Sequence, residues 1–157
     1  KLKIIGTGYE EDRLKRMSKE NIEFLGFVDD RLLANFYASA KGVIFTPELE
    51  YGLIPLEANA SGTPVICYGR GGVTETMVHY SADRNNSEHY SAIFYYEQTA
   101  KALNEAIELF ESMPYNQKFL VQHALAWDVA NFKKSLRKFV DKFYLEIQSK
   151  HDHAPDE

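Results

Sequence analysis

An acidic loop and the helix predicted after it carry the residues best suited to bind a ligand. The loop holds Glu48 and Glu50 and ends at Gly52, and the helix begins near Pro55 and includes Glu57. The first backbone N–H groups of a helix have no partner within it, so that end favours a phosphate. The Glu57 side chain leans back toward that end and can accept hydrogen bonds from a ribose diol. Its residue type also allows a second interpretation, an acid that simply stabilises the helix start.

Three other loops that contain glycine are expected beside this one. They are residues 6–8, 26–28 and 68–72, and each follows a predicted strand. In an open parallel sheet, ligands bind beyond the carboxyl ends of the strands, and glycine lets the backbone approach a ligand closely. Glycine is also common in tight connections, so each loop taken singly has a purely structural interpretation. For Arg70 in the last loop, a solvent-facing position is favoured over phosphate contact.

Short apolar runs and helix-period stretches predict the elements that position these loops. The expected strands are residues 2–5, 22–25, 42–45, 64–67 and a weaker 92–95. Helices are expected at residues 10–18 and from a cap at Asp29 or Asp30 to Tyr37. Two more are expected, from Pro55 to a stop at Gly62 and from Thr99 to near Pro114. Nearly continuous apolar strands that alternate with helices indicate a parallel sheet covered on both faces. The expected class is α/β with a doubly wound, Rossmann-like sheet.

The end of the chain predicts a long helix. Apolar residues recur there at helical spacing and are expected to be core: Phe132, Leu136, Phe139, Val140, Phe143 and Ile147. The polar run 81–89 is expected to be a surface loop, and residues 151–157 a disordered tail.

Composition excludes several classes of function. The chain has 157 residues with 18 Lys and Arg against 23 Asp and Glu, a net charge of −5, which argues against nucleic acid as a partner. The lone Cys67 excludes an internal disulfide and a cysteine-cluster metal site. No run is long and apolar enough to span a membrane, and no signal peptide is recognisable. We expect a cytoplasmic protein.

One continuous block carries a specific resemblance. Residues 52–66, GLIPLEANASGTPVI, followed by GGVTE at 71–75, resemble the C-terminal, donor-binding domain of the retaining family 4 glycosyltransferases. The flanking segments agree with this family: IIGTG at 4–8, NIEFLGFV at 21–28, FYYEQT at 94–99 and Phe132, the last two being similar to a mannosyltransferase-like branch. The match extends over about residues 1–147.

The resemblance implies half of a two-domain GT-B fold. Residues 1–150 would be the nucleotide-sugar donor-binding domain, and an acceptor domain would precede them. The chain begins at Lys1, within an apolar run, so we expect a piece of a longer polypeptide. The isolated piece is expected to be inactive.

The resemblance also assigns roles to individual residues. Glu57 matches the second glutamate of the family's pair, which binds the ribose hydroxyls. The amides of Gly52, Leu53 and Ile54 correspond to the site of the donor sugar and diphosphate, Gly26, Phe27 and Val28 to the nucleobase position, and Gly8, Tyr51 and Arg70 complete the expected donor-binding set.

The sequence departs from the family pattern at one important position. Leu49 stands eight residues before Glu57, where the family has its first glutamate. Leucine cannot hydrogen-bond the donor sugar, so we expect a neighbouring carboxylate to substitute, Glu50 ahead of Glu48 because it is nearer Gly52. If neither glutamate takes this place, we expect a catalytically weakened site. The Arg and Lys that neutralise the diphosphate in the family are not among these residues.

The family implies transfer of a hexose from a UDP-sugar or GDP-sugar, with retention, to a glycan or lipid-linked acceptor in polysaccharide biosynthesis. No Asp-x-Asp motif is present, and we expect neither a metal nor a cofactor. Peripheral attachment at the inner membrane face stays open. Two alternatives remain, a non-catalytic sugar-nucleotide-binding module with a degenerate site and a nucleotide-sugar epimerase of the same fold.

Overall fold

Strands and helices alternate along the first two thirds of the protein, and helices form the rest. The structure is a computed structural model and describes residues 1–81 and 89–151. In chain order the elements are β1 (Leu2–Ile5), α1 (Glu11–Met17), β2 (Ile22–Gly26), α2 (Asp30–Ser39), β3 (Val43–Phe45), α3 (Ile54–Ala60), β4 (Val65–Tyr68), α4 (Val73–Thr76), β5 (Ala92–Tyr95), α5 (Ala100–Ser112), α6 (Gln117–Leu125) and α7 (Val129–His151). Most of the predicted loop 81–89 and of the predicted tail 151–157 lies outside the described residues.

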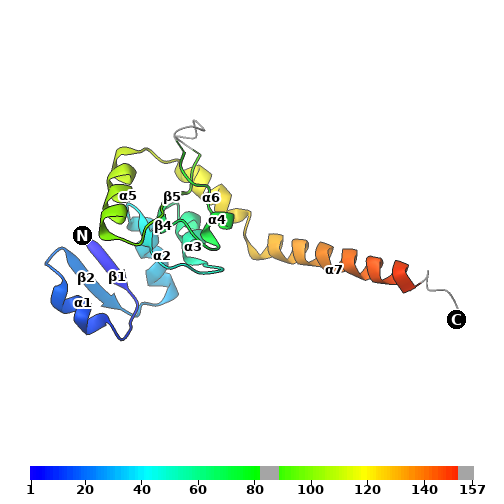
Figure 1. The fold of residues 1–157 in the computed structure, drawn as a ribbon, viewed down its shortest axis with the longest axis horizontal. Helices are drawn as coiled ribbons and strands as arrows, with labels where there is room; N and C mark the ends of the chain where they lie inside the picture. The colour runs from blue at the N-terminus through cyan, green and yellow to red at the C-terminus, as the bar shows by residue number, and fades with distance from the viewer. Residues whose placement is uncertain (82–88, 152–157) are drawn as a thin grey trace.

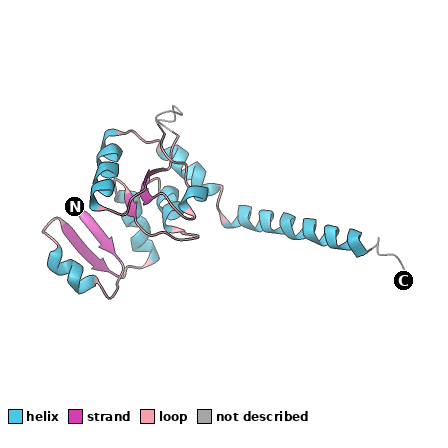
Figure 2. Cartoon of the chain, viewed as in Figure 1, coloured by secondary structure: helices cyan, strands magenta, loops and turns pink. Residues whose placement is uncertain are grey.

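The strands are parallel, and they form two sheets instead of the single sheet expected. β1 pairs with β2, as Figure 2 shows near the N-terminus, while β3, β4 and β5 pair in that order in a separate sheet. The two-stranded sheet is thinly covered, and Leu2 at its start is 42% exposed. The predicted α/β class with parallel strands and a long C-terminal helix is confirmed.

The three-stranded sheet is buried on both faces, as the apolar runs predict. Side chains alternate along a strand, so Val65 and Cys67 of β4 pack in a cluster with residues of α2 and α3. Ile66 and Tyr68 point the other way, into a cluster with Phe110 of α5. This sheet therefore holds the carboxyl ends of its strands rigidly at one edge.

Four described helices begin at side-chain caps, and one of them is α7, where the Asp128 side chain accepts a hydrogen bond from the Asn131 amide at 2.7 Å. Asp29 accepts a hydrogen bond from the Leu32 amide at 2.9 Å, and Thr99 accepts one from the Ala102 amide at 3.2 Å, as predicted. Asn116 caps α6 in the same way, a helix that was not predicted.

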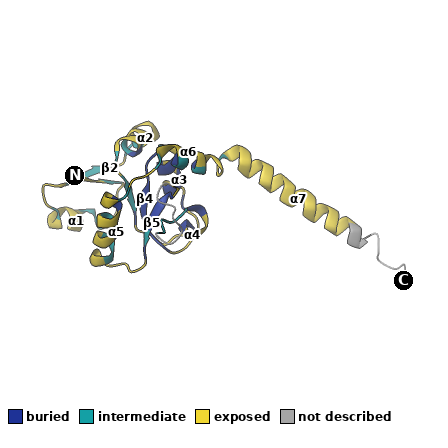
Figure 3. Cartoon of the chain, turned by 90° about the horizontal axis from the view of Figure 1, so that it is seen from above, coloured by how far each residue is buried: buried dark blue, intermediate teal, exposed yellow. Residues whose placement is uncertain are grey.

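The long helix α7 forms as predicted, but its apolar residues are not core. Phe132, Phe139 and Phe143 are 62%, 60% and 47% exposed. Figures 1 and 3 show the reason, because α7 projects away from the body and no other described element covers it. Helical spacing predicts the helix, whereas burial also requires a packing partner. No helix in the described residues meets the length and apolarity needed to cross a membrane.

Candidate functional site

The loop between β3 and α3, residues 46–53, lies against the turn that precedes α4. The Gly72 amide donates a hydrogen bond to the Leu49 carbonyl at 2.8 Å. A Cβ at Gly71 would overlap the Leu49 carbonyl oxygen, and one at Gly72 would overlap that of Glu50. Gly71 also has a φ of +71°, which favours glycine. The two loops thus fit together only because both turn positions lack a side chain.

The start of α3 combines a buried scaffold with one exposed acid. No side chain caps this end, and Pro55 occupies the first turn, where its missing N–H costs nothing. Leu56 and Ala58 are buried against the sheet, which turns Glu57 outward. The periodicity of α3 therefore explains why this carboxylate is exposed.

The carboxylate of Glu57 has one polar partner in the described residues, the hydroxyl of Tyr37. This hydroxyl donates a hydrogen bond to Oε2 of Glu57 at 3.3 Å. Burial, together with the charge of Glu57, raises the pKa of Tyr37 to about 12, so the hydroxyl keeps its proton at neutral pH. Sequence reasoning placed Tyr37 on a helix but missed this contact, because twenty residues separate the partners.

The acidic loop presents its side chains to solvent. Glu48 and Glu50 are exposed, Leu49 is 46% exposed and Tyr51 is 59% exposed. Within residues 1–81 and 89–151, no side-chain hydrogen bond or ion pair holds either flanking glutamate. Both carboxylates are free to reorient toward a ligand.

The four glycine-bearing loops meet as two pairs. The Gly6 amide donates to the Gly26 carbonyl at 2.8 Å, which joins loop 6–8 to loop 26–28 beyond β1 and β2. In this pair Gly8 is exposed, Phe27 is 85% exposed and Val28 is half-buried. The second pair is loop 46–53 with turn 68–72. No hydrogen bond among the described residues connects the two pairs.

The charged groups around the second pair are mostly acidic. Glu48, Glu50, Glu57 and Glu75 are exposed there, and Arg70 is the described cation of the turn. The Arg70 guanidinium lies 5.9 Å from the centre of the Tyr68 ring. The exposed carboxylates would repel a diphosphate on this side, and Arg70 is the described charge in the turn that would attract one.

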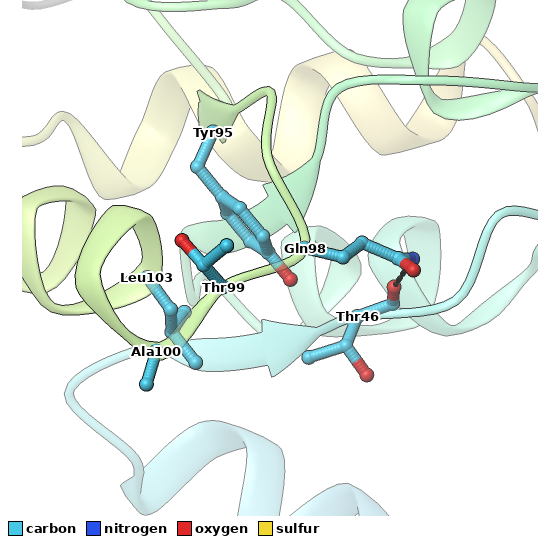
Figure 4. A pocket seen from close by; sticks show the side chains of 6 residues that line it. All are labelled: Thr46, Tyr95, Gln98, Thr99, Ala100 and Leu103. Atoms are coloured by element: carbon cyan, nitrogen blue, oxygen red, sulfur yellow. Dashed lines mark hydrogen bonds between the residues drawn. The ribbon is translucent and has the colours of Figure 1, made fainter.

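A hollow of about 290 Å³ lies beside the predicted site and was not predicted. Its lining residues are Thr46, Tyr95, Gln98, Thr99, Ala100 and Leu103 (Figure 4). Gln98 spans its edge and donates a hydrogen bond to the Thr46 carbonyl at 3.2 Å. The hollow shares Thr46 with the acidic loop and otherwise has no residue of the predicted set. Across the described ranges, no three His, Cys, Asp or Glu side chains gather as a metal site.

Parallel strands flanked by helices, with glycine-containing loops and an exposed carboxylate at the strand ends, are typical of α/β domains that bind a ligand at this edge. Residues 1–127 match the family described as glycosyl transferases group 1, and the chain belongs to this family.

Curated relatives of this chain are glycosyltransferases. The glycosyltransferase MJ1607 of Methanocaldococcus jannaschii is 36% identical over 85 residues, which cover 50% of this chain and 22% of that protein. The alpha-1,3/1,6-mannosyltransferase ALG2 of Candida glabrata is 28% identical over 83 residues, 52% of this chain and 18% of that protein. The matched region is thus about a fifth of the length of these relatives.

Solved structures support the same fold. The sucrose-phosphate synthase of Thermosynechococcus elongatus superposes with a TM-score of 0.71 at 20% identity, over 92% of this chain and 39% of that one. A GtfA/B complex gives a TM-score of 0.65 at 19% identity, over 90% of this chain and 29% of that one. The structural neighbours are GT-B glycosyltransferases, as predicted from the sequence.

Proposed function

We propose that this chain is the donor-binding half of a retaining glycosyltransferase that uses a UDP-sugar or GDP-sugar. The observation that carries the proposal is the exposed carboxylate of Glu57, in the first turn of α3 at the carboxyl end of β3. In this proposal Glu57 binds the ribose diol, and the amides of Gly52, Leu53 and Ile54 face the donor sugar and diphosphate. Residues 26–28 contact the nucleobase.

The proposed chemistry is electrostatic and needs no protein nucleophile. The bond between the anomeric carbon and the diphosphate oxygen breaks, and negative charge grows on the leaving diphosphate. Backbone amides and cations stabilise that charge in the transition state. The acceptor hydroxyl, of a glycan or a lipid-linked sugar, then forms the new glycosidic bond on the same face and gives its proton to the departing diphosphate oxygen. A preceding domain supplies the acceptor site and further cations.

The carboxylate toward the donor sugar comes from a neighbour of Leu49. Glu50 is the first candidate and Glu48 the second, because both are exposed and neither has a side-chain partner in the described part of the chain. A backbone adjustment of one residue in this exposed loop would bring either one toward the sugar.

Nucleotide binding by the full-length protein tests the role of Glu57. Glu57→Ala should weaken binding of UDP or GDP, measured by calorimetry, by roughly 1.5–3 kcal/mol, the range for a hydrogen bond to a charged group. Glu108→Ala is the matched control, since it removes the same charge from an exposed position on α5. Equal affinity of Glu57→Ala and the wild type for the nucleotide would show that Glu57 does not bind the ribose.

Leu49 favours a second candidate, a sugar-nucleotide-binding module that has lost its chemistry. Its apolar side chain is 46% exposed where the family resemblance calls for a glutamate. The substitution Leu49→Glu in the full-length protein distinguishes a working transferase from a binding module without catalysis. A large gain in sugar transfer would indicate a degenerate site, and a loss would indicate that Leu49 belongs to a working one.

A further inference from the structure

Tyr37 is held rigidly at both ends. Its ring packs in the core cluster with Phe45, Leu56 and Val65, and only 8% of the residue is exposed. Its carbonyl accepts a hydrogen bond from the Thr63 hydroxyl at 2.6 Å. The phenolic oxygen therefore has a fixed position beneath α3, and it meets Oε2 of Glu57 at 3.3 Å.

Glu57, in contrast to Tyr37, is not enclosed by the core. Its side chain is exposed, and among the described residues the Tyr37 hydroxyl is the one polar group that its carboxylate meets. A carboxylate has about four acceptor positions on two oxygens. The contact uses one position on Oε2 and leaves Oε1, together with the rest of Oε2, for two further donors. Two vicinal hydroxyls are such a pair of donors.

We propose that Tyr37 is a positioning residue, whose hydroxyl holds the Glu57 carboxylate in the orientation that accepts both hydroxyls of the donor's ribose. This inference rests on the proposed ribose-binding role of Glu57. It goes beyond that role because it names the group that orients the carboxylate before the nucleotide arrives.

Physical chemistry supports the role of a buried tyrosine as the hydrogen-bond donor that orients Glu57. A free glutamate side chain loses rotamer freedom when it binds, and that loss weakens affinity unless the orientation is set beforehand. A packed tyrosine ring has almost no freedom left to lose. Because burial raises the pKa of Tyr37 to about 12, its hydroxyl donates throughout the pH range in which the enzyme would work.

The test compares ribose and deoxyribose nucleotides on the full-length protein. Calorimetry gives dissociation constants for UDP, GDP and their 2′-deoxy counterparts. Tyr37→Phe keeps the ring and removes one oxygen, and we expect affinity for the better-bound ribonucleotide to fall about three- to tenfold, the worth of one hydrogen bond. The preference for ribose over deoxyribose should fall as well. A purely structural role would weaken both nucleotides equally and leave the preference unchanged.

A double-mutant cycle isolates the pathway through Glu57. Tyr37→Phe should have no further effect on binding in a Glu57→Ala background. Tyr90→Phe is the matched control: it also loses a tyrosine hydrogen bond, from the buried Tyr90 to the Pro114 carbonyl at 2.9 Å. It should lower the melting temperature comparably and leave binding and ribose preference at wild-type values.

The outcomes separate this inference from the proposed function. Loss of affinity in Glu57→Ala, with wild-type affinity and preference in Tyr37→Phe, overturns the positioning role alone. Unchanged binding in Glu57→Ala, or no binding of UDP and GDP by the wild type, overturns the ribose site and the inference with it. Equal effects of Tyr37→Phe in both backgrounds also overturn the inference.

Discussion

At the scale of single residues, His123 is a half-buried imidazole that connects two helices. Its Nε2 lies 2.7 Å from the Thr76 carbonyl of α4, and its ring stacks on Phe119 with the centroids 6.0 Å apart. Burial lowers its pKa below the usual 6.5, and the hydrogen bond to Thr76 opposes this only in part. The neutral ring, with its proton on Nε2, therefore suits the folded protein.

This lowered pKa predicts an acid-sensitive stability. Between the lower folded pKa and the unfolded value of 6.5, the unfolded chain binds more protons, so stability is complete above about pH 6.5 and declines below it. Urea unfolding at about pH 7.5 and about pH 5.5 should show a larger loss in the wild type than in His123→Gln. Equal losses in the two proteins would mean that His123 is not responsible.

Residue-scale prediction succeeded where a local rule applied. Asp29 and Thr99 were recognised as caps because capping depends on residue type and position. The contacts of Tyr37 with Glu57 and of His123 with Thr76 were missed, because they join residues 20 and 47 positions apart. The proposed roles of Glu57, Glu50 and Glu48 stay predictions from the family pattern.

At the scale of elements, the fit between loop 46–53 and the turn before α4 depends on Gly72. Its φ of −60° suits any residue, so only the overlap of a new Cβ with the Glu50 carbonyl oxygen matters. Gly72→Ala should lower the free energy of unfolding by about 1–3 kcal/mol, the range for overpacking. It should also weaken UDP or GDP binding, because loop 46–53 must move.

Gly8→Ala is the control for this change. A Cβ at Gly8 meets nothing within 4 Å, so the urea midpoint should stay close to that of the wild type. A Gly72→Ala protein as stable as Gly8→Ala would show that the loop yields without cost.

All five strands were predicted close to their bounds, since apolar runs between helices are a local signal. Their division into two sheets was not, because pairing partners are chosen by tertiary packing.

At the scale of the whole molecule, the body and α7 differ in what stabilises them. The body has two clusters of buried residues around the three-stranded sheet. α7 has exposed apolar side chains along its length and one described ion pair, between Lys142 and Glu146 at 3.9 Å. Exposed pairs of this kind add little to stability. Apolar residues recur at helical spacing in both regions, but only in the body do other elements pack against them.

Substitution of one phenylalanine in each region tests this difference in stabilisation directly. Phe110 on α5 is 8% exposed and Phe139 on α7 is 60% exposed. Phe110→Ala should lower the free energy of unfolding of this chain by about 3–5 kcal/mol, because it removes buried apolar surface and leaves a cavity. Phe139→Ala should change it by less than about 0.5 kcal/mol, since its ring is already largely in water. Urea unfolding followed by circular dichroism gives both values, and a cost for Phe139→Ala as large as that for Phe110→Ala would show that α7 packs on the body in solution.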